Sequence, residues 1–376
     1  MTRIGAAMVA LAALAIGGAG CTAGEGVQAG ERVTVYVSMP LRGPDAAEGR
    51  DVVRAAKLAL ADAKGRAGEL LVRAVYLDDA SGQGARARWS PTVAAANARD
   101  AAEDSSAIAY VGEFHSGATR ASLPITNEAR MLQVSPASAA VDLVQPFLGA
   151  GDQIPEEVQA TGERTFGRVI PSDEVQAEAA ARWVNRLGAR RLGTVSDGSE
   201  FGLTMVRAFR QSLPGARFTR GRDDLVYYGG EPERLPAPLV LSFQGTVMAT
   251  DALLAREPSA AARGLLATSA AQDPSQLPPA GERFVRAFRK GYGREPGRYA
   301  AYGYEAMAVV LDSIRRAGDR GDSRDAVADA FFDTQDRDSV LGAYSIDEVG
   351  DTTLGRLAGY RLAGGRPRFE AALRVP

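Results

Sequence analysis

The sequence has few of the side chains on which metal binding and covalent catalysis depend. Its 376 residues include one cysteine, Cys21, and one histidine, His115. No disulfide can therefore form within the chain, and a zinc site built from cysteine and histidine is excluded. A serine–histidine pair would have to use His115, and the adjacent Ser116 is badly placed to turn its hydroxyl onto that ring.

Sequence motifs of common catalysts are missing as well. No nucleophile elbow, P-loop or dinucleotide-binding glycine motif follows a predicted strand. Adjacent carboxylates such as Asp78 and Asp79 are more typical of solvated or capping positions than of catalysis. Only glycosidase-type chemistry with separated carboxylates stays open. We therefore expect a binding protein, not an enzyme, with no cofactor and no metal.

The charge balance is nearly neutral. A formal net charge of -2 favours neither nucleic acid nor an anionic membrane, and no block of Lys and Arg with interleaved aromatics occurs. No membrane-length apolar run follows the first twenty residues, and no solenoid repeat is present. We expect no nucleic-acid partner.

The first thirty residues predict export. Arg3 is followed by an apolar run over 4–16 and by small residues up to Cys21, which is typical of a secretory signal over 1–20. This start resembles a bacterial lipoprotein signal, in which Cys21 would carry the lipid that anchors the chain to the membrane. It departs from that pattern at Gly18, where a Leu is usual, and an ordinary cleaved signal with an incidental cysteine is the alternative. Residues 21–31 predict a flexible tether.

Strands and helices alternate after the tether, which indicates parallel βαβ units in an α/β domain. A loop insertion over 143–165 interrupts this first series. Strands are predicted at 32–39, 70–77, 107–111 and 131–134, and helices at 49–63, 92–103 and 118–129.

A second series of the same kind follows and predicts a second α/β lobe. Here strands are predicted at 191–196, 225–228, 239–243 and 264–268, and helices at 175–187, 203–213 and 246–255. Three further helices at 280–292, 299–316 and 325–332 and two late strands at 342–346 and 357–362 complete the chain.

The loop after the strand at 107–111 is the first candidate for a ligand site. Ligands of open α/β sheets bind beyond the carboxyl ends of the strands, and a helix that begins there directs its free N–H groups at the ligand. We therefore expect Ser116, Gly117 and Thr119 to hold the anionic end of a small molecule. The alternative is an ordinary strand-to-helix turn with Ser116 as the N-cap.

Several short motifs resemble those of one protein family. They occur in the family's order over nearly the whole chain after the tether: 112–119, Ser135-Pro136-Ala137-Ser138, 168–173 with Gln176, Phe201-Gly202, 226–230 and 299–306. In this order they resemble the periplasmic binding proteins of the branched-chain amino acid (Leu/Ile/Val) transport type.

The resemblance implies a type I fold, with two Rossmann-like three-layer lobes joined by a three-segment hinge. Lobe 1 would comprise 32–166 plus 271–343, and lobe 2 would comprise 167–270 plus 344–376. It also implies an extracytoplasmic monomer that binds an amino acid or a similar small carboxylate and delivers it to ABC permease subunits. A ligand sensor and a degenerate surface module without transport function are the alternatives.

The resemblance also suggests binding residues. Ser116 and the N–H groups near Gly117 would hold the ligand carboxylate, and the carbonyl of Ala137 would accept from its ammonium. His115 and Ser138 belong to the same matching stretches. Phe201 and Tyr299 match aromatic walls, although either could be a core residue.

Three departures from the family pattern concern the second half of the site. Ala139 stands where the family has a Thr, and Gln244 stands near a family acidic residue. The segment 229–238 contains three prolines and is too short for the helix usual there, which would leave one face of the second sheet thinly covered.

Overall fold

The computed structural model describes residues 32–146, 154–219, 223–231, 234–241, 243–254, 265–363 and 366–376. The predicted signal, Cys21 and the tether lie outside these residues. Within them, no helix has both the length and the apolar character needed to cross a bilayer.

The first lobe is built on a six-stranded sheet in the order β2-β3-β1-β6-β7-β8. All neighbours run parallel except β2 and β3. The strands are β1 (Arg32–Met39), β2 (Arg66–Ala67), β3 (Leu70–Asp78), β6 (Ala107–Val111), β7 (Leu132–Ser135) and β8 (Phe166–Arg168). A small ribbon of β4 (Ala80–Ser81) and β5 (Arg88–Trp89) lies beside it.

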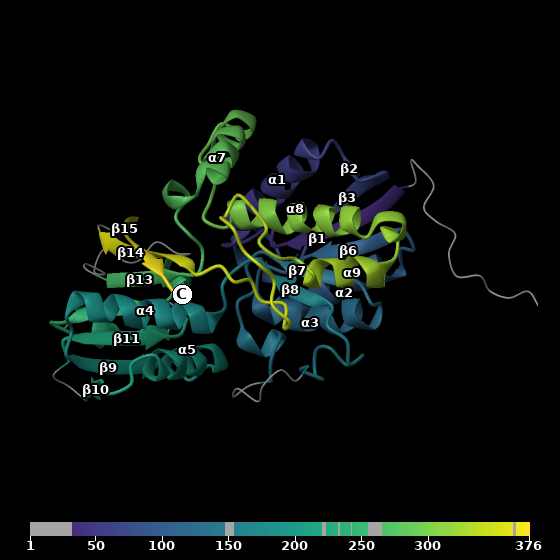
Figure 1. Cartoon of the computed structure of the whole chain (residues 1–376). Helices are drawn as coiled ribbons and strands as arrows, with labels where there is room; N and C mark the ends of the chain where they lie inside the picture. The colour runs from purple at the N-terminus through teal and green to yellow at the C-terminus, as the bar shows by residue number, and fades with distance from the viewer. Residues whose placement is uncertain are drawn as a thin grey trace, which may run out of the picture.

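Helices cover both faces of this sheet, as its sequence requires. In β1, Val35 faces the main apolar cluster shared with α1 and α8, whereas Tyr36 faces a second cluster shared with α2. Figure 1 shows α8 and α9 crossing the sheet on the near side. The helices are α1 (Ala46–Asp62), α2 (Pro91–Glu103), α3 (Ser116–Glu128), α7 (Pro279–Tyr292), α8 (Ala300–Arg316) and α9 (Arg324–Phe332).

The second lobe contains a seven-stranded sheet in the order β10-β9-β11-β12-β13-β14-β15. Its first five strands are parallel, and β14 and β15 are added antiparallel. The strands are β9 (Arg191–Ser196), β10 (Arg217–Phe218), β11 (Leu225–Gly229), β12 (Thr246–Ala249), β13 (Leu265–Ser269), β14 (Arg356–Ala363) and β15 (Arg366–Arg374). The helices α4 (Asp173–Leu187) and α5 (Glu200–Gln211) pack on one face.

Three predictions for the chain were wrong. The segment 239–243 is not a strand, because a short helix α6 (Ala237–Leu241) lies there, and the predicted helix at 246–255 begins with strand β12. Pro238 lies in the first turn of α6, where its missing N–H breaks no helical hydrogen bond. The predicted strand at 342–346 is replaced by two isolated bridges, which pair Arg337 with Tyr344 and Ile346 with Thr352.

The other face of the second sheet has no long helix among the described residues. Tyr227 points towards α5, and its neighbour Tyr228 points to this opposite face. Instead of a full crossover helix, α6 has five residues. Leu235, Leu239 and Phe243 from this segment pack against the apolar cluster of that face. Within the described part of the chain, this face is therefore covered by α6, by a short 3-10 turn at 251–254 and by irregular segments.

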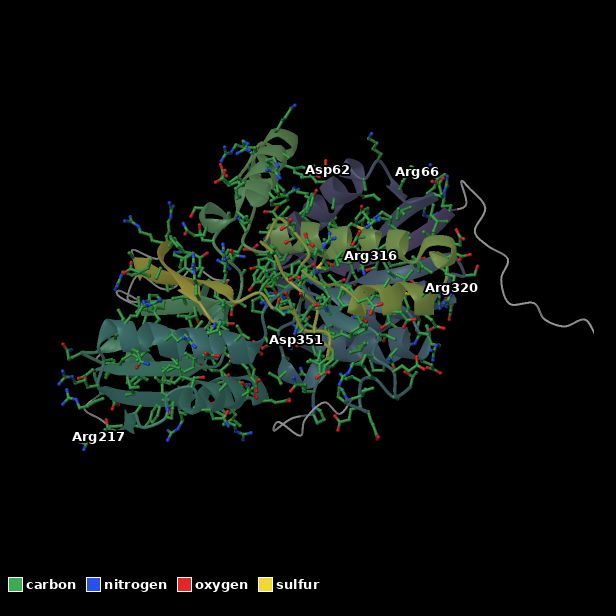
Figure 2. All side chains as sticks on the ribbon, viewed as in Figure 1. Asp62, Arg66, Arg217, Arg316, Arg320 and Asp351 are labelled. Carbon is green, nitrogen blue, oxygen red and sulfur yellow. The ribbon has the colours of Figure 1, made fainter. Side chains whose placement is uncertain are left out.

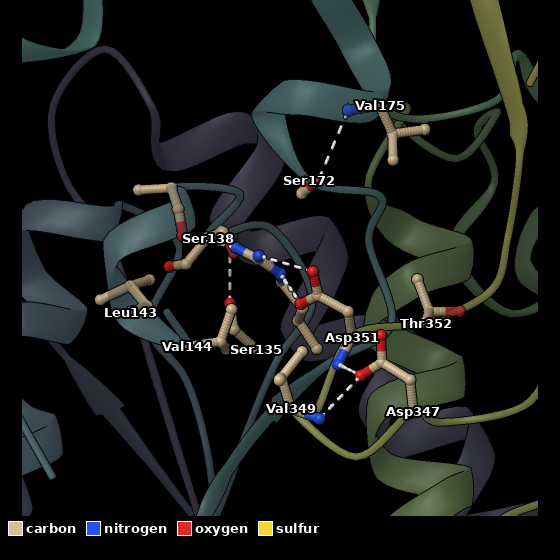
Figure 3. A network of polar contacts seen from close by, with 12 residues as sticks. Ser135, Ser138, Leu143, Val144, Ser172, Val175, Asp347, Val349, Asp351 and Thr352 are labelled. Atoms are coloured by element: carbon tan, nitrogen blue, oxygen red, sulfur yellow. Dashed lines mark hydrogen bonds and ion pairs between the residues drawn. The ribbon is translucent and has the colours of Figure 1, made fainter. Parts of the chain in front are cut away.

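Three chain segments pass between the lobes, and a buried arginine ties two of them together. Arg168, at the end of β8, is fully buried and forms a bidentate ion pair with Asp351 at 2.6 and 3.0 Å. It also donates to the carbonyl of Ala140 at 2.6 Å. Asp351 lies between the two lobes (Figure 2), and its own N–H donates to the carboxylate of Asp347 at 2.7 Å (Figure 3). This network fixes the crossover after β8 against the crossover before β14.

Candidate functional site

A cavity of about 770 Å³ lies between the lobes. Its first wall comes from the loops after β6 and β7 and the start of α8, and its second wall from the starts of α4 and α5 and the turn after β12. Both sheets therefore present the carboxyl ends of their parallel strands to one space, where ligands of open α/β sheets bind. The volume suits a small organic molecule.

The start of α3 offers an anion site at the first wall. Ser116 and Gly117 occupy the first turn of α3, whose N–H groups have no carbonyl partner within the helix. The Ser116 hydroxyl accepts a hydrogen bond from the N–H of Ala140 at 3.2 Å. Because its oxygen is used as an acceptor there, the hydroxyl proton remains to be donated to a ligand. The amides and the hydroxyl together can hold a carboxylate.

Aromatic rings line the same wall in a continuous row. The Trp89 and His115 rings stack with centroids 5.5 Å apart. Phe114 contacts His115 edge-on at 5.1 Å and Tyr299 at 5.0 Å. His115 also lies 3.2 Å from the carboxylate of Asp45, which orients its ring. The row gives the cavity an apolar surface with flat faces.

Asp251 and Asp173 are two of the carboxyl groups on the second wall. The hydroxyl of Tyr299 reaches across the cavity and donates to Asp251 at 2.7 Å, and the Gln176 amide donates to the other oxygen of Asp251 at 3.3 Å. Asp173 lies at the start of α4. Burial raises the pKa of the Asp173 carboxyl to about 7, and the charge of Asp251 adds to this while that of Arg168 opposes it. Asp251 can accept a further hydrogen bond from a ligand ammonium while it keeps those from Tyr299 and Gln176.

The structure brings together most of the residues that the sequence suggested. Ser138 is fully buried and lies outside the lining, and Gln244 is exposed and also lies outside the lining. The predicted residues that do line it are His115, Ser116, Gly117, Ala137, Ala139, Phe201 and Tyr299.

Ser138 and Thr119 support the site from behind. The Ser138 hydroxyl donates to the carbonyl of Glu113 at 3.0 Å and lies 2.7 Å from the hydroxyl of Thr119. Thr119 is the fourth residue of α3, is fully buried and does not line the cavity, which corrects the expectation that it contacts a ligand. These hydroxyls fix the loop that carries the anion site.

A buried acid pair lies beneath that loop. Glu113 is fully buried and accepts hydrogen bonds from Tyr110 at 2.6 Å and from Ser38 at 2.8 Å. Burial and the neighbouring charge of Asp79 raise the pKa of Glu113 well above its ordinary value, which favours the protonated form. Burial likewise raises the pKa of Asp79 to about 6.

Sequence reasoning missed Asp251, an acidic residue of the second wall. It follows β12 by two residues, at the position where a ligand-facing residue is expected after a parallel strand. Because a strand was predicted at 239–243, the family's acidic position was expected near Gln244. The apolar run Val247-Met248-Ala249 before Asp251 was the signal that would have located it.

Two α/β lobes that enclose a small-molecule cavity define a hinged binding protein. A family model described as "Periplasmic binding protein" matches residues 32–230 and 239–365. The chain belongs to this family, which implies a location outside the cytoplasm.

Individual relatives agree with this assignment. The chain is 27% identical over 355 residues to an "Amino acid binding protein" of Pseudomonas aeruginosa, with 85% of this chain and 87% of the relative covered. It is similar to a leucine binding protein from Thermotoga maritima, with a TM-score of 0.71, 25% identity and 91% and 99% of the two chains covered. It also shares the fold of a solute binding protein of an ABC transporter from Rhodopseudomonas palustris in complex with p-hydroxybenzoic acid, with a TM-score of 0.70, 16% identity and 92% and 97% covered. The type I two-lobed architecture is thus confirmed.

Proposed function

We propose that this chain is the solute-binding component of an ABC importer and that it takes an amino acid or a similar small carboxylate into the cavity between its lobes. The observation that carries the proposal is the start of α3, which faces Asp251 across the cavity. An anion site on one wall and a carboxylate on the other match the two charges of an α-amino acid.

Individual contacts follow from this placement. The ligand carboxylate lies against the N–H groups of Ser116 and Gly117 and accepts from the Ser116 hydroxyl. The ammonium donates to Asp251 and to the carbonyl of Ala137, which lines the cavity. No hydrogen bond among the described residues uses that carbonyl. Ala139 contributes no hydroxyl, so the ammonium depends on Asp251.

The relatives support a carboxylate as the common feature of the ligand. One is named for amino acids, one for leucine, and one was solved with p-hydroxybenzoic acid. All these molecules carry a carboxylate, whereas only the first two kinds carry an ammonium. The anion site of the first wall is accordingly the part of the site on which the proposal depends most.

The attachment to the membrane and the partners belong to the same proposal. We infer that Cys21 carries a lipid that anchors the protein outside the cytoplasm, that the protein is a monomer, and that ABC permease subunits receive its ligand. The supporting observations are the signal-like sequence before Cys21 and the family membership. Labelling cells with a radioactive lipid precursor tests the anchor. The parent protein should carry the label and be released from membranes only by detergent, whereas Cys21→Ser should carry no label.

Titration calorimetry against single amino acids and short carboxylates tests the binding proposal. Ser116→Ala should weaken the best ligand by about 1–3 kcal/mol, because a hydrogen bond to a charged group is lost. Ser212→Ala, which removes a hydroxyl bonded to the Ala208 carbonyl outside the cavity, should leave the affinity unchanged. Equal affinity of Ser116→Ala and the parent protein would remove the start of α3 from the site.

A further inference from the structure

The walls of the cavity carry more negative than positive charge. Among the residues that the structure describes, seven carboxyl groups and three guanidinium groups line it. A neutral aliphatic amino acid needs one carboxylate for its ammonium and one cationic or N–H-rich site for its carboxylate. The excess of carboxyl groups is therefore unexplained by such a ligand.

The arginines do not cancel this excess, because carboxylates of the first wall already engage two of them. Arg120 forms a bidentate ion pair with Asp142, with both distances 2.6 Å. Arg298 faces Glu48 at 3.6 Å. The third, Arg88, is exposed at the edge of the cavity. Arg120 also pairs with Glu200 of the second wall at 3.8 Å, but the ion pairs of the described residues do not include Asp173 or Asp251.

Asp173 and Asp251 are thus left facing the cavity together. Within the described part of the chain neither takes part in an ion pair, and the contacts of Asp251 come from a hydroxyl and an amide. The guanidinium of Arg168 is committed to Asp351 and to backbone carbonyls. Asp173 is buried, with 6% of its surface exposed. Two carboxyl groups in one poorly solvated wall attract more positive charge than one ammonium supplies.

The opposite wall suits a flat or extended cation. The rings of Trp89, Phe114 and Tyr299 line the cavity beside the anion site. Aromatic faces attract ammonium and guanidinium groups, and a planar guanidinium also stacks on them. Carboxylates on one side and aromatic rings on the other are a common arrangement for binding an organic cation.

We propose that the ligand carries a net positive charge and that a basic α-amino acid, with a guanidinium or a second ammonium, is the preferred class. This inference rests on the proposed function, because it places the ligand carboxylate at the start of α3. Asp251 then pairs with the α-ammonium, and Asp173 pairs with the cation of the side chain. A branched-chain aliphatic ligand would leave Asp173 without a partner.

Calorimetry with matched ligands tests the charge preference. L-arginine and L-citrulline have nearly the same shape and differ in charge, and L-lysine, L-ornithine and L-leucine extend the panel. At least one basic ligand should bind about tenfold or more tightly than both neutral ligands. Equal or tighter binding of leucine or citrulline would overturn the inference and leave the proposed function standing. The absence of binding by every member of the panel would overturn both.

Variants in α4 test whether Asp173 causes the preference for a positively charged ligand. Asp173→Asn keeps the shape of the side chain and should weaken the basic ligand by about tenfold. Its affinity for citrulline should stay the same. Glu178→Gln removes one carboxylate from the exposed side of the same helix, where Glu178 pairs with Arg182, and should change neither affinity. If Asp173→Asn and Glu178→Gln bind the basic ligand equally well, Asp173 is not the cation site. Circular dichroism of each variant shows that the fold is retained.

Discussion

Replacement of Asp173 by Asn should make the protein more stable at neutral and alkaline pH, although it removes a charge from the start of a helix. A carboxylate in the first turn of α4 is favoured by the helix dipole. Burial works against it, together with the charge of Asp251. Because the net result is a pKa of about 7, burial outweighs the dipole and Arg168 at this position.

The pKa gives both the sign and the size of the effect. An unfolded Asp173 ionises near its ordinary pKa of 3.8, whereas the native one stays protonated until about pH 7. The free energy of unfolding therefore falls as the pH rises between these values, and the full loss is present above about pH 7. The difference corresponds to an upper limit of about 4 kcal/mol. Asn resembles the protonated carboxyl group, so the variant escapes this loss.

The two tryptophans allow the measurement to be confined to the second lobe. Trp89 lines the cavity in the first lobe, and Trp183 lies on α4 itself. In a Trp89→Phe background, urea unfolding followed by fluorescence reports on α4. Asp173→Asn should match its parent at about pH 4 and exceed it by about 2–4 kcal/mol at about pH 8. Glu178→Gln provides the control on the exposed side of the helix.

The surroundings of Asp173 explain what a contrary result would mean. The charged groups that act on it come from the first wall, the crossover and the second lobe: Arg120, Asp142, Arg168 and Asp251. The stability difference between Asp173→Asn and its parent could instead stay the same at every pH. In that case Arg120 and Arg168 offset burial and keep the carboxyl group of Asp173 ionised. The argument that burial dominates would then be refuted.

Variants at three further sites probe the hinge, the anion site and the buried acid pair. Arg168→Met should cost about 3–5 kcal/mol in urea unfolding, because it leaves Asp351 without its partner, and a second change of Asp351 to Asn should recover part of the loss. Gly117→Ala should weaken ligand binding about tenfold in calorimetry, because its methyl group would lie 2.5 Å from the Trp89 ring and must displace it; unchanged affinity would contradict this. Glu113→Gln should change the melting temperature little, since the raised pKa of Glu113 favours its protonated form, whereas Glu113→Ala should lower it by removing the acceptors for two buried hydroxyls.

The first lobe could be predicted from the sequence because its signals are local. The strands β1 and β6 are continuous buried runs, β3 is nine residues long, and the helices between them show a clear apolar period. The anion site was predictable for the same reason, since strand, loop and helix start follow one another along the chain. Thr119 was misplaced because its direction depends on how α3 packs, which spacing alone does not give.

The second lobe was harder to predict between β11 and β13. Short apolar runs do not show whether a segment is strand or helix, and α6 and β12 have only five and four residues. This ambiguity also hid Asp251. Likewise, β15 and the pairing of β14 with β13 depend on contacts between distant parts of the sequence. The interaction between Asp173 and Asp251 could be predicted only after α4 and β12 had both been located.

The order in which the chain supplies its two sheets has a consequence for folding. Helix α8, which packs against α1 and the main core of the first lobe, follows β13 of the second sheet in the sequence. The second sheet in turn stays open at β13 until β14 arrives near the end of the chain. A chain emerging from the ribosome or from a translocation channel therefore exposes apolar surface on both halves until its last third is available. Such non-local assembly slows folding and gives chaperones time to act.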